Sequence, residues 1–205
     1  MDPISRRELL VGGVVYGSSL WMLLEVPRPH AARAAATSSR PLVLTEASWR
    51  TVEAITARII PTDDQPGAVE AGCTNFIDKA LAHEDAALRP TYEEGVAGID
   101  AVSRKRFAKR FVELASEQQD DVLAALESGK ADGWPASDPS PAKFFETVRA
   151  HTIVGFLADP KYGGNRGYAG WKVVGYPGGG HHLGGYSPAQ LMGKAKIQTA
   201  WGEEV

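Results

Sequence analysis

The feature that most constrains this chain is the spacing of its apolar residues between residues 45 and 158, which is helical throughout. In the stretch TEASWRTVEAITARII (45–60), apolar side chains recur every three or four residues, Thr45 can cap the amino end, and Pro61 stops the helix. No strand-length segment before Asp159 alternates between apolar and polar residues, and no internal repeat is visible. The pattern therefore predicts an all-α fold, a small irregular helical bundle.

Two further helices follow in the same stretch. One is expected from about Val69 through Leu81, with a single apolar stripe that includes Cys73. The next begins near Pro90, because proline is favourable in the first turn of a helix. It runs into the basic residues 104–106, which we expect to be a solvated helix end.

Two more helices complete the predicted helical domain, residues 45–158. Ser116 and Gln119 predict a capping box for a helix through Leu126. Ser140 is expected to cap the last helix, with Pro141 at its first position. The apolar face of that helix consists of Phe144, Phe145, Val148 and Phe156.

The composition changes at Asp159. The stretch DPKYGGNRGYAGWKVVGYPGGGHHLGGY (159–186) crowds glycines with aromatic residues and histidines, so we expect it not to be helical and to be too aromatic for a flexible linker. Trp, Tyr and Arg dominate interface hot spots, and glycine allows close backbone approach, so residues 159–205 are predicted to be a partner-binding segment. The alternative is that these aromatic side chains pack on the protein's own helices. The expected contact residues are Tyr162, Asn165, Arg166, Tyr168, Trp171, Lys172 and Tyr176.

Residues 1–36 have the pattern of an export signal, and residues 37–44 that of a short linker. The uncharged run 9–24 is shorter than the roughly 20 apolar residues of a membrane span and contains three glycines. Small residues at 32–36 fit signal cleavage, and the Ser-Arg-Arg-x-Leu-Leu arrangement indicates the twin-arginine route. An uncleaved amino-terminal anchor is the alternative. The predicted signal residues are Ser5, Arg6, Arg7, Leu9 and Leu10.

Charge and cysteine content exclude several classes of function. Residues 1–36 carry four of the 22 basic and three of the 25 acidic residues, so the remaining 169 residues have a net charge near −4, which disfavours a nucleic-acid binder. That length is enough for one domain with a core. Cys73 is the only cysteine, which excludes an internal disulfide, a thiolate-rich metal or iron–sulfur site and a c-type haem attachment motif. Cys73 is expected to be buried, the alternative being a disulfide to another chain.

Few residues are candidates for chemistry. Adjacent Asp63 and Asp64 are expected to serve hydration or capping rather than to act as a carboxylate pair. His151 lies at the edge of an apolar stripe, where a core or interface role is favoured over a catalytic one. His181 and His182 lack a third ligand at useful spacing, so a loop contact is favoured over a metal site. No phosphate-binding loop, dinucleotide fingerprint or nucleophile elbow is present, so no motif makes an active site by itself.

Three stretches together resemble the gluconate 2-dehydrogenase subunit 3 family: SRRELL (5–10), IIPTDDQPGAVEAG (59–72) and FFETVRAHTIVGFLADPKYGGNRGYAGWKVVGYPG (144–178). The resemblance covers most of residues 45–180, and the DPKYGGNR…GWK…GYPG run is its most specific part. It implies that the residues matching this run serve the fold and the subunit contact. They are Asp159, Pro160, Tyr162, Gly163, Gly164, Asn165, Arg166, Gly170, Trp171, Lys172, Gly175, Pro177 and Gly178.

The resemblance also implies a periplasmic, membrane-associated complex that oxidises a sugar or sugar acid. A large flavoprotein of the glucose–methanol–choline class would hold FAD, and a multi-haem cytochrome c would pass the electrons on. The small subunit would bind the flavoprotein, carry the signal read by the twin-arginine translocase, and contribute no catalytic residue, metal ligand or cofactor. Two rival hypotheses remain: a stand-alone periplasmic enzyme that uses His151, His181 or His182, and a binding or scaffold module without a redox partner.

Overall fold

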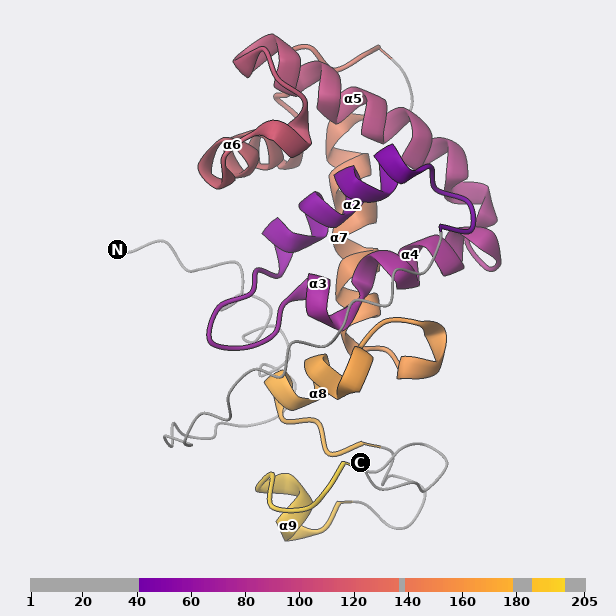
Figure 1. The fold of residues 1–205 in the computed structure, drawn as a ribbon, viewed down its shortest axis with the longest axis vertical. Helices are drawn as coiled ribbons and strands as arrows, with labels where there is room; N and C mark the ends of the chain where they lie inside the picture. The colour runs from indigo at the N-terminus through magenta and orange to yellow at the C-terminus, as the bar shows by residue number, and fades with distance from the viewer. Residues whose placement is uncertain (1–40, 137–138, 179–185, 198–205) are drawn as a thin grey trace. The chain divides into compact units, whose positions relative to one another are not determined.

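The computed structural model describes residues 41–136, 139–178 and 186–197 (Figure 1). Every regular element in these ranges is helical, which confirms the all-α prediction, and none of these helices has the length and apolar character of a membrane span. With η for 3₁₀ helices, the elements before residue 159 are α2 (Glu46–Ile59), α3 (Ala68–Ala71), α4 (Cys73–Ala82), η1 (Ala86–Leu88), α5 (Arg89–Phe107), η2 (Phe111–Glu113), α6 (Ser116–Glu127) and α7 (Pro141–Leu157).

Helix α7 is the central element of this helical body. It contacts α2, α4, α5 and α6, and Figure 1 shows it passing behind α2. Helix α5 approaches it closely at Gly95, where a Cβ atom would lie 2.0 Å from the ring of Phe144. The predicted apolar face of α7 is buried in this core: Phe144, Phe145, Val148 and Phe156.

The helix starts that the sequence predicts most clearly are confirmed. The Thr45 hydroxyl accepts a hydrogen bond from the Ser48 N–H (3.1 Å), so Thr45 caps α2. The Ser140 hydroxyl accepts one from the Lys143 N–H (3.3 Å) and caps α7. Pro90 lies in the first turn of α5. Each of these starts depends on residues that are close neighbours in the sequence.

The predicted helix from Val69 to Leu81 is broken in two at Gly72. This glycine has φ of 73°, a left-handed conformation that ends α3, and α4 begins at the next residue. Because the break rotates the chain, Val69 leaves the predicted apolar stripe and is 43% exposed. Cys73 stays on the buried side.

The start of α6 also differs from the prediction. The residue at the N-cap is Ala115, whose backbone N–H donates to the side-chain oxygen of Gln118 (3.2 Å). Ser116 is the first helical residue instead of the cap. The side-chain amide of Gln119 donates to the carbonyl of Phe111 (3.0 Å), so it fastens η2 to α6 and forms no capping box.

The described part of the predicted linker is fastened to the body. The backbone N–H groups of Leu42, Val43 and Leu44 donate to the carboxylate of Asp78 at 2.6, 3.1 and 2.9 Å. Asp78 belongs to α4 and is only 2% exposed. A buried carboxylate needs such donors, so these bonds hold residues 42–44 against α4.

Candidate functional site

Residues 159–178, which we call the docked segment, fold into short helices. These are η3 (Pro160–Tyr162), η4 (Arg166–Tyr168) and α8 (Ala169–Val174), and α9 (Pro188–Leu191) follows. The expectation of a non-helical carboxy-terminal segment is therefore wrong for these residues. Left-handed backbone at Gly163, Asn165 and Tyr168 turns the chain between the short helices, which is why the composition did not reveal them.

Asn165 joins the docked segment to the end of α7. Its backbone N–H donates to the carbonyl of Gly155 (2.8 Å), and its side-chain amide donates to the carbonyl of Ala158 (2.9 Å). Its side-chain oxygen accepts from the N–H of Gly170 (2.8 Å). Because the last carbonyls of a helix have no partner within it, Asn165 supplies a cap from outside α7. The sequence predicts Asn165 to be a partner-contact residue, but the structure shows that its side chain is fully buried.

Trp171 is also an internal residue. It is 7% exposed, and its indole N–H donates to the carbonyl of Leu157 at 2.6 Å. The centroid of its ring lies 5.3 Å from that of Tyr168 and 5.0 Å from that of Tyr176. The ring centroids of Tyr176 and Tyr186 are 6.3 Å apart. Burial, together with the hydrogen bond to Tyr186, raises the pKa of Tyr176 to about 12. For Trp171 the structure thus favours packing on the protein's own helices over exposure to a partner.

Two glycines allow the docked segment to lie directly on the backbone of α7. A Cβ atom at Gly164 would lie 2.1 Å from the carbonyl oxygen of Gly155. One at Gly170 would lie 1.8 Å from the carbonyl oxygen of Phe156. The close backbone approach expected of these glycines therefore occurs within the chain.

Other residues of the docked segment face outward. Tyr162 is 51% exposed, Lys172 is exposed, and Arg166 and Tyr168 are half-buried. The Arg166 side chain lies over the α3–α4 junction, with its Nε 2.6 Å from the position of a Cβ atom on Gly72. Of the predicted partner-binding set, Tyr162 and Lys172 are therefore exposed, and Arg166, Tyr168 and Tyr176 are half-buried.

His151 lies in a partly buried polar cluster of the body with Tyr92 and Asp85. The Tyr92 hydroxyl is 2.9 Å from its Nδ1, and Asp85 Oδ2 is 3.4 Å from its Nε2. Burial lowers the pKa of His151, and this effect outweighs the opposite effect of the Asp85 charge. The neutral ring can thus accept from Tyr92 and donate toward Asp85. This is the core role that the sequence favoured, and Tyr92 and Asp85 are partners that it did not indicate.

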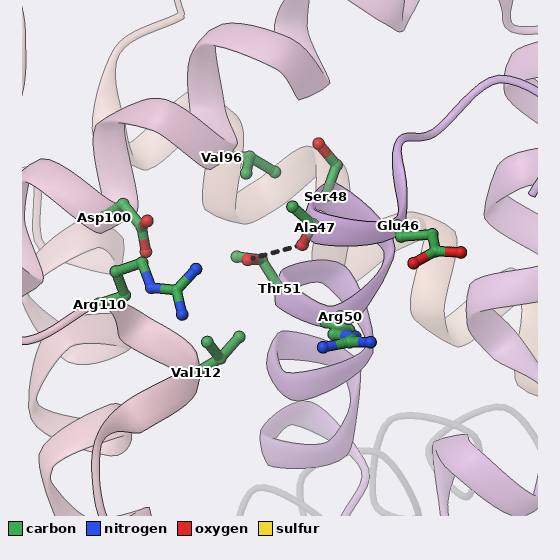
Figure 2. A pocket seen from close by; sticks show the side chains of 9 residues that line it. All are labelled: Glu46, Ala47, Ser48, Arg50, Thr51, Val96, Asp100, Arg110 and Val112. Carbon is green, nitrogen blue, oxygen red and sulfur yellow. Dashed lines mark hydrogen bonds between the residues drawn. The ribbon is translucent and has the colours of Figure 1, made fainter.

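A groove of about 340 Å³ lies elsewhere on the body, between α2, α5 and η2 (Figure 2). Three of its polar side chains are engaged within the chain: Arg110 with Glu113 (2.8 Å), Asp100 with Arg104 (3.1 Å), and the Thr51 hydroxyl with a backbone carbonyl. Figure 2 shows Asp100 and Arg110 opposite the residues of α2. The groove is lined by Glu46, Ala47, Ser48, Arg50, Thr51, Val96, Asp100, Arg110 and Val112.

The remaining candidates have structural surroundings. The Asp63 carboxylate accepts a hydrogen bond from the Gln65 N–H (2.8 Å), which agrees with a turn role, and Asp64 is exposed. Cys73 is fully buried, as predicted, and burial raises the pKa of its thiol to about 12. Within the described ranges, no three His, Cys, Asp or Glu side chains are grouped to hold a metal ion.

Several predicted features lie outside the residues that the structure describes. They are the signal residues Ser5, Arg6, Arg7, Leu9 and Leu10, the cleavage stretch 32–36, and His181 and His182.

Comparison with known families finds a match to the family described as Gluconate 2-dehydrogenase subunit 3, over residues 46–178. The matched range covers more than half of the chain. It includes the helical body and ends at the last residue of the docked segment. Comparison with curated proteins and with solved structures gave no match.

Proposed function

Because this chain belongs to the gluconate 2-dehydrogenase subunit 3 family, and is therefore a subunit of a dehydrogenase complex, we propose that it is the noncatalytic small subunit of that complex. Its partner is an FAD-dependent flavoprotein of the glucose–methanol–choline class that oxidises a sugar or sugar acid. The chain binds and stabilises the flavoprotein. A multi-haem cytochrome c takes the electrons in the membrane-associated assembly.

The observation that carries the proposal is that the family match extends through the docked segment. This segment is rigidly attached, because Asn165 and Trp171 satisfy carbonyls at the end of α7. A rigid attachment reduces the conformational entropy that binding costs. The segment then presents Arg and Tyr, two residue types that dominate interface hot spots, at its outer positions.

We further propose that the chain directs export of the assembled pair to the periplasm. FAD is made in the cytoplasm, and its binding site exists only in a folded flavoprotein. A flavoprotein without its own signal would have to cross the membrane folded and attached to a chain that has one. The Ser-Arg-Arg-x-Leu-Leu arrangement at Arg6 and Arg7 would be the address that the twin-arginine translocase reads for both proteins.

Co-purification tests the partner. The full chain carries a carboxy-terminal tag and is isolated from periplasm and from membranes. A co-purifying protein with flavin absorbance and sugar or sugar-acid dehydrogenase activity is expected, together with a haem-containing protein. Isolation of the chain without a flavoprotein from every fraction would refute the proposal.

Replacement of Arg6 and Arg7 by lysine tests export. Lysine keeps the charge but lacks the planar guanidinium that a receptor can read. Dehydrogenase activity, measured with an artificial acceptor, should move from the periplasmic and membrane fractions to the cytoplasm. An exported protein that uses another route serves as the control. Normal periplasmic activity in the double-lysine strain would exclude the escort role and leave the subunit role standing.

A further inference from the structure

The charges of this chain are distributed unevenly along its sequence. Residues 45–158 contain 12 Lys and Arg against 19 Asp and Glu. Residues 159–205 contain five Lys and Arg against three acidic residues, which are Asp159, Glu203 and Glu204. A basic region on an otherwise acidic protein creates a local positive potential that attracts an oppositely charged surface.

Ion pairs account for only part of the basic charge of the described residues. Within the described part of the body, five basic residues form ion pairs with neighbouring acids: Arg58 with Asp120, Arg104 with Asp100, Lys105 with Asp132, Arg110 with Glu113, and Arg149 with Glu146. Others in the body, such as Arg50 and Lys109, form no ion pair with a described residue. In the docked segment, Arg166 and Lys172 have neither a hydrogen bond nor an ion pair with any described residue. Their positive charge is therefore not neutralised by the part of the chain that the structure describes.

The Arg166 side chain lies against Gly72. Its Nε, Cδ and Cζ lie 2.6, 2.9 and 2.9 Å from the position of a Cβ atom on Gly72, so a larger residue there would force the Arg166 side chain to shift. Gly72 has φ of 73°, which glycine adopts without strain. The half-buried guanidinium thus lies over the α3–α4 junction, where the absence of a Cβ atom on Gly72 gives it room.

We propose that Arg166, supported by Lys172, is the electrostatic anchor of the subunit interface and pairs with a carboxylate on an acidic surface of the flavoprotein. This inference rests on the proposed function and names the chemistry of its contact. A guanidinium can form two parallel hydrogen bonds to one carboxylate, which a single ammonium cannot match. The exposed ring of Tyr162 adds apolar contact area in the same segment.

A protein carboxylate suits this site better than the other acidic surfaces available. An anionic lipid surface attracts flexible lysines as well as arginines and does not require one fixed guanidinium. A second copy of this chain would offer its acidic body, but the family is that of a subunit of a dehydrogenase complex, which favours a different subunit as the partner. Both alternatives are outcomes of the test.

The experiment uses the full chain, immobilised through a tag, and measures the flavoprotein that it retains as NaCl rises from about 50 to about 500 mM. The variants are Arg166→Gln, Arg166→Lys and Lys172→Gln. Arg149→Gln is the matched control, because Arg149 lies on α7 and already pairs with Glu146 at 2.6 Å. Circular dichroism and thermal melting verify that each variant is folded.

We expect Arg166→Gln to weaken retention roughly tenfold or more and to flatten its dependence on salt. Arg166→Lys should recover only part of the loss, because lysine keeps the charge without the fork. Lys172→Gln should have a smaller effect, and Arg149→Gln none. Gly72→Ala should act like Arg166→Gln at the interface, because it displaces the guanidinium without removing it.

Distinct results separate this inference from the proposed function. If the wild-type chain retains no flavoprotein at any salt concentration, both are overturned. If folded Arg166→Gln retains the flavoprotein as well as wild type, or if wild-type retention does not respond to salt, only the electrostatic anchor is overturned. The anchor is likewise overturned if Arg166→Gln leaves retention unchanged but abolishes self-association in sedimentation, or abolishes binding to vesicles that contain anionic phospholipid.

Discussion

The helical body and the docked segment secure their backbones in different ways. In the body, Thr45 and Ser140 cap helices through N–H groups three residues away. In the docked segment, the Asn165 side chain reaches a carbonyl seven residues away, the Trp171 indole one 14 residues away, and the amide of Asn75 donates to the Gly163 carbonyl from 88 residues away. The helix starts at Thr45 and Ser140 are thus capped by near neighbours in the sequence, whereas the docked segment is joined to α7 and α4 by residues distant in the sequence.

The glycines of the two regions show the same difference. In α5, a Cβ atom at Gly95 or Gly98 would meet the side chains of Phe144 or Trp134. In the docked segment, one at Gly164 or Gly170 would meet backbone carbonyl oxygens of α7. A side chain can rotate away, but the backbone of a central helix cannot move without disturbing everything packed on it. The docked segment should therefore tolerate substitution less well than its loop-like sequence indicates.

The sharpest test of this comparison is Gly170→Ala. Alanine is normally the better residue in a helix, but here its Cβ would lie 1.8 Å from the Phe156 oxygen. We expect the free energy of unfolding to fall by about 3 kcal/mol or more, in the range of severe steric substitutions. Urea denaturation followed by circular dichroism measures the change.

Gly129→Ala is the matched control for this variant. Gly129 lies in the body at φ of 70°, and nothing lies within 4 Å of the Cβ position. It should cost only about 1 to 2 kcal/mol, from the left-handed conformation alone. Equal stability of the Gly170 and Gly129 variants would remove the distinction between the two regions.

The second largest effect is expected from the cap residues. Asn165→Ala removes two side-chain hydrogen bonds and leaves the Ala158 carbonyl and the Gly170 N–H without their partner, at a cost of about 2 to 4 kcal/mol. Ser140→Ala removes one exposed cap from α7 and should cost about 1 kcal/mol. Thermal unfolding of both variants in the same buffer measures the two losses of stability. An equal loss in Ser140→Ala and Asn165→Ala would contradict the prediction.

The same contrast explains what the sequence could predict of the fold. The starts at Thr45, Pro90 and Ser140 follow from residues a few positions apart, and they are correct. The sequence does not predict the break at Gly72, because a glycine within an apolar stripe is also compatible with an unbroken helix; its left-handed φ of 73° is seen only in the structure. The cap at Ala115 was missed because a backbone N–H and Gln118 perform it, without the serine side chain.

For the candidate site, the sequence identified the right stretch but not which residues face outward. Trp171 and Asn165 were expected at a partner surface, yet their partners are carbonyls of α7, which no local pattern reveals. One usable signal was present. Asp159-Pro160 and Ser187-Pro188 repeat the cap-then-proline pattern of Ser140-Pro141, and a helix begins at each proline.

Cys73 offers a way to observe the docked segment separately from the body. The thiol is fully buried at the start of α4, beside Gly72 and beneath the Arg166 side chain, and its pKa is raised to about 12. A buried protonated thiol reacts slowly with alkylating reagents, so labelling requires local opening. Asn165→Ala should speed labelling more than Ser140→Ala does, under conditions where both variants remain folded. Equal labelling rates in the two variants would show that the segment does not open independently of the body.

The smallest effect should come from pH, and it should act on the body. Burial lowers the pKa of His151 below its ordinary value near 6.5, so the unfolded chain binds this proton more readily than the folded one. The stability that His151 contributes is therefore fully present above about pH 6.5 and is lost as pH falls toward its folded pKa.

This effect should be confined to the body. Tyr92 and Asp85, which contact the ring, belong to the body, and the described docked segment contains no histidine. Between about pH 7 and pH 5, the free energy of unfolding should decline less steeply in His151→Gln than in wild type, since glutamine can still accept from Tyr92 without titrating. The rate of Cys73 labelling, after correction for the change in thiolate fraction with pH, should change little over the same range. A parallel rise in labelling would mean that protonation of His151 also loosens the docked segment, and the two regions would then respond to pH as one unit.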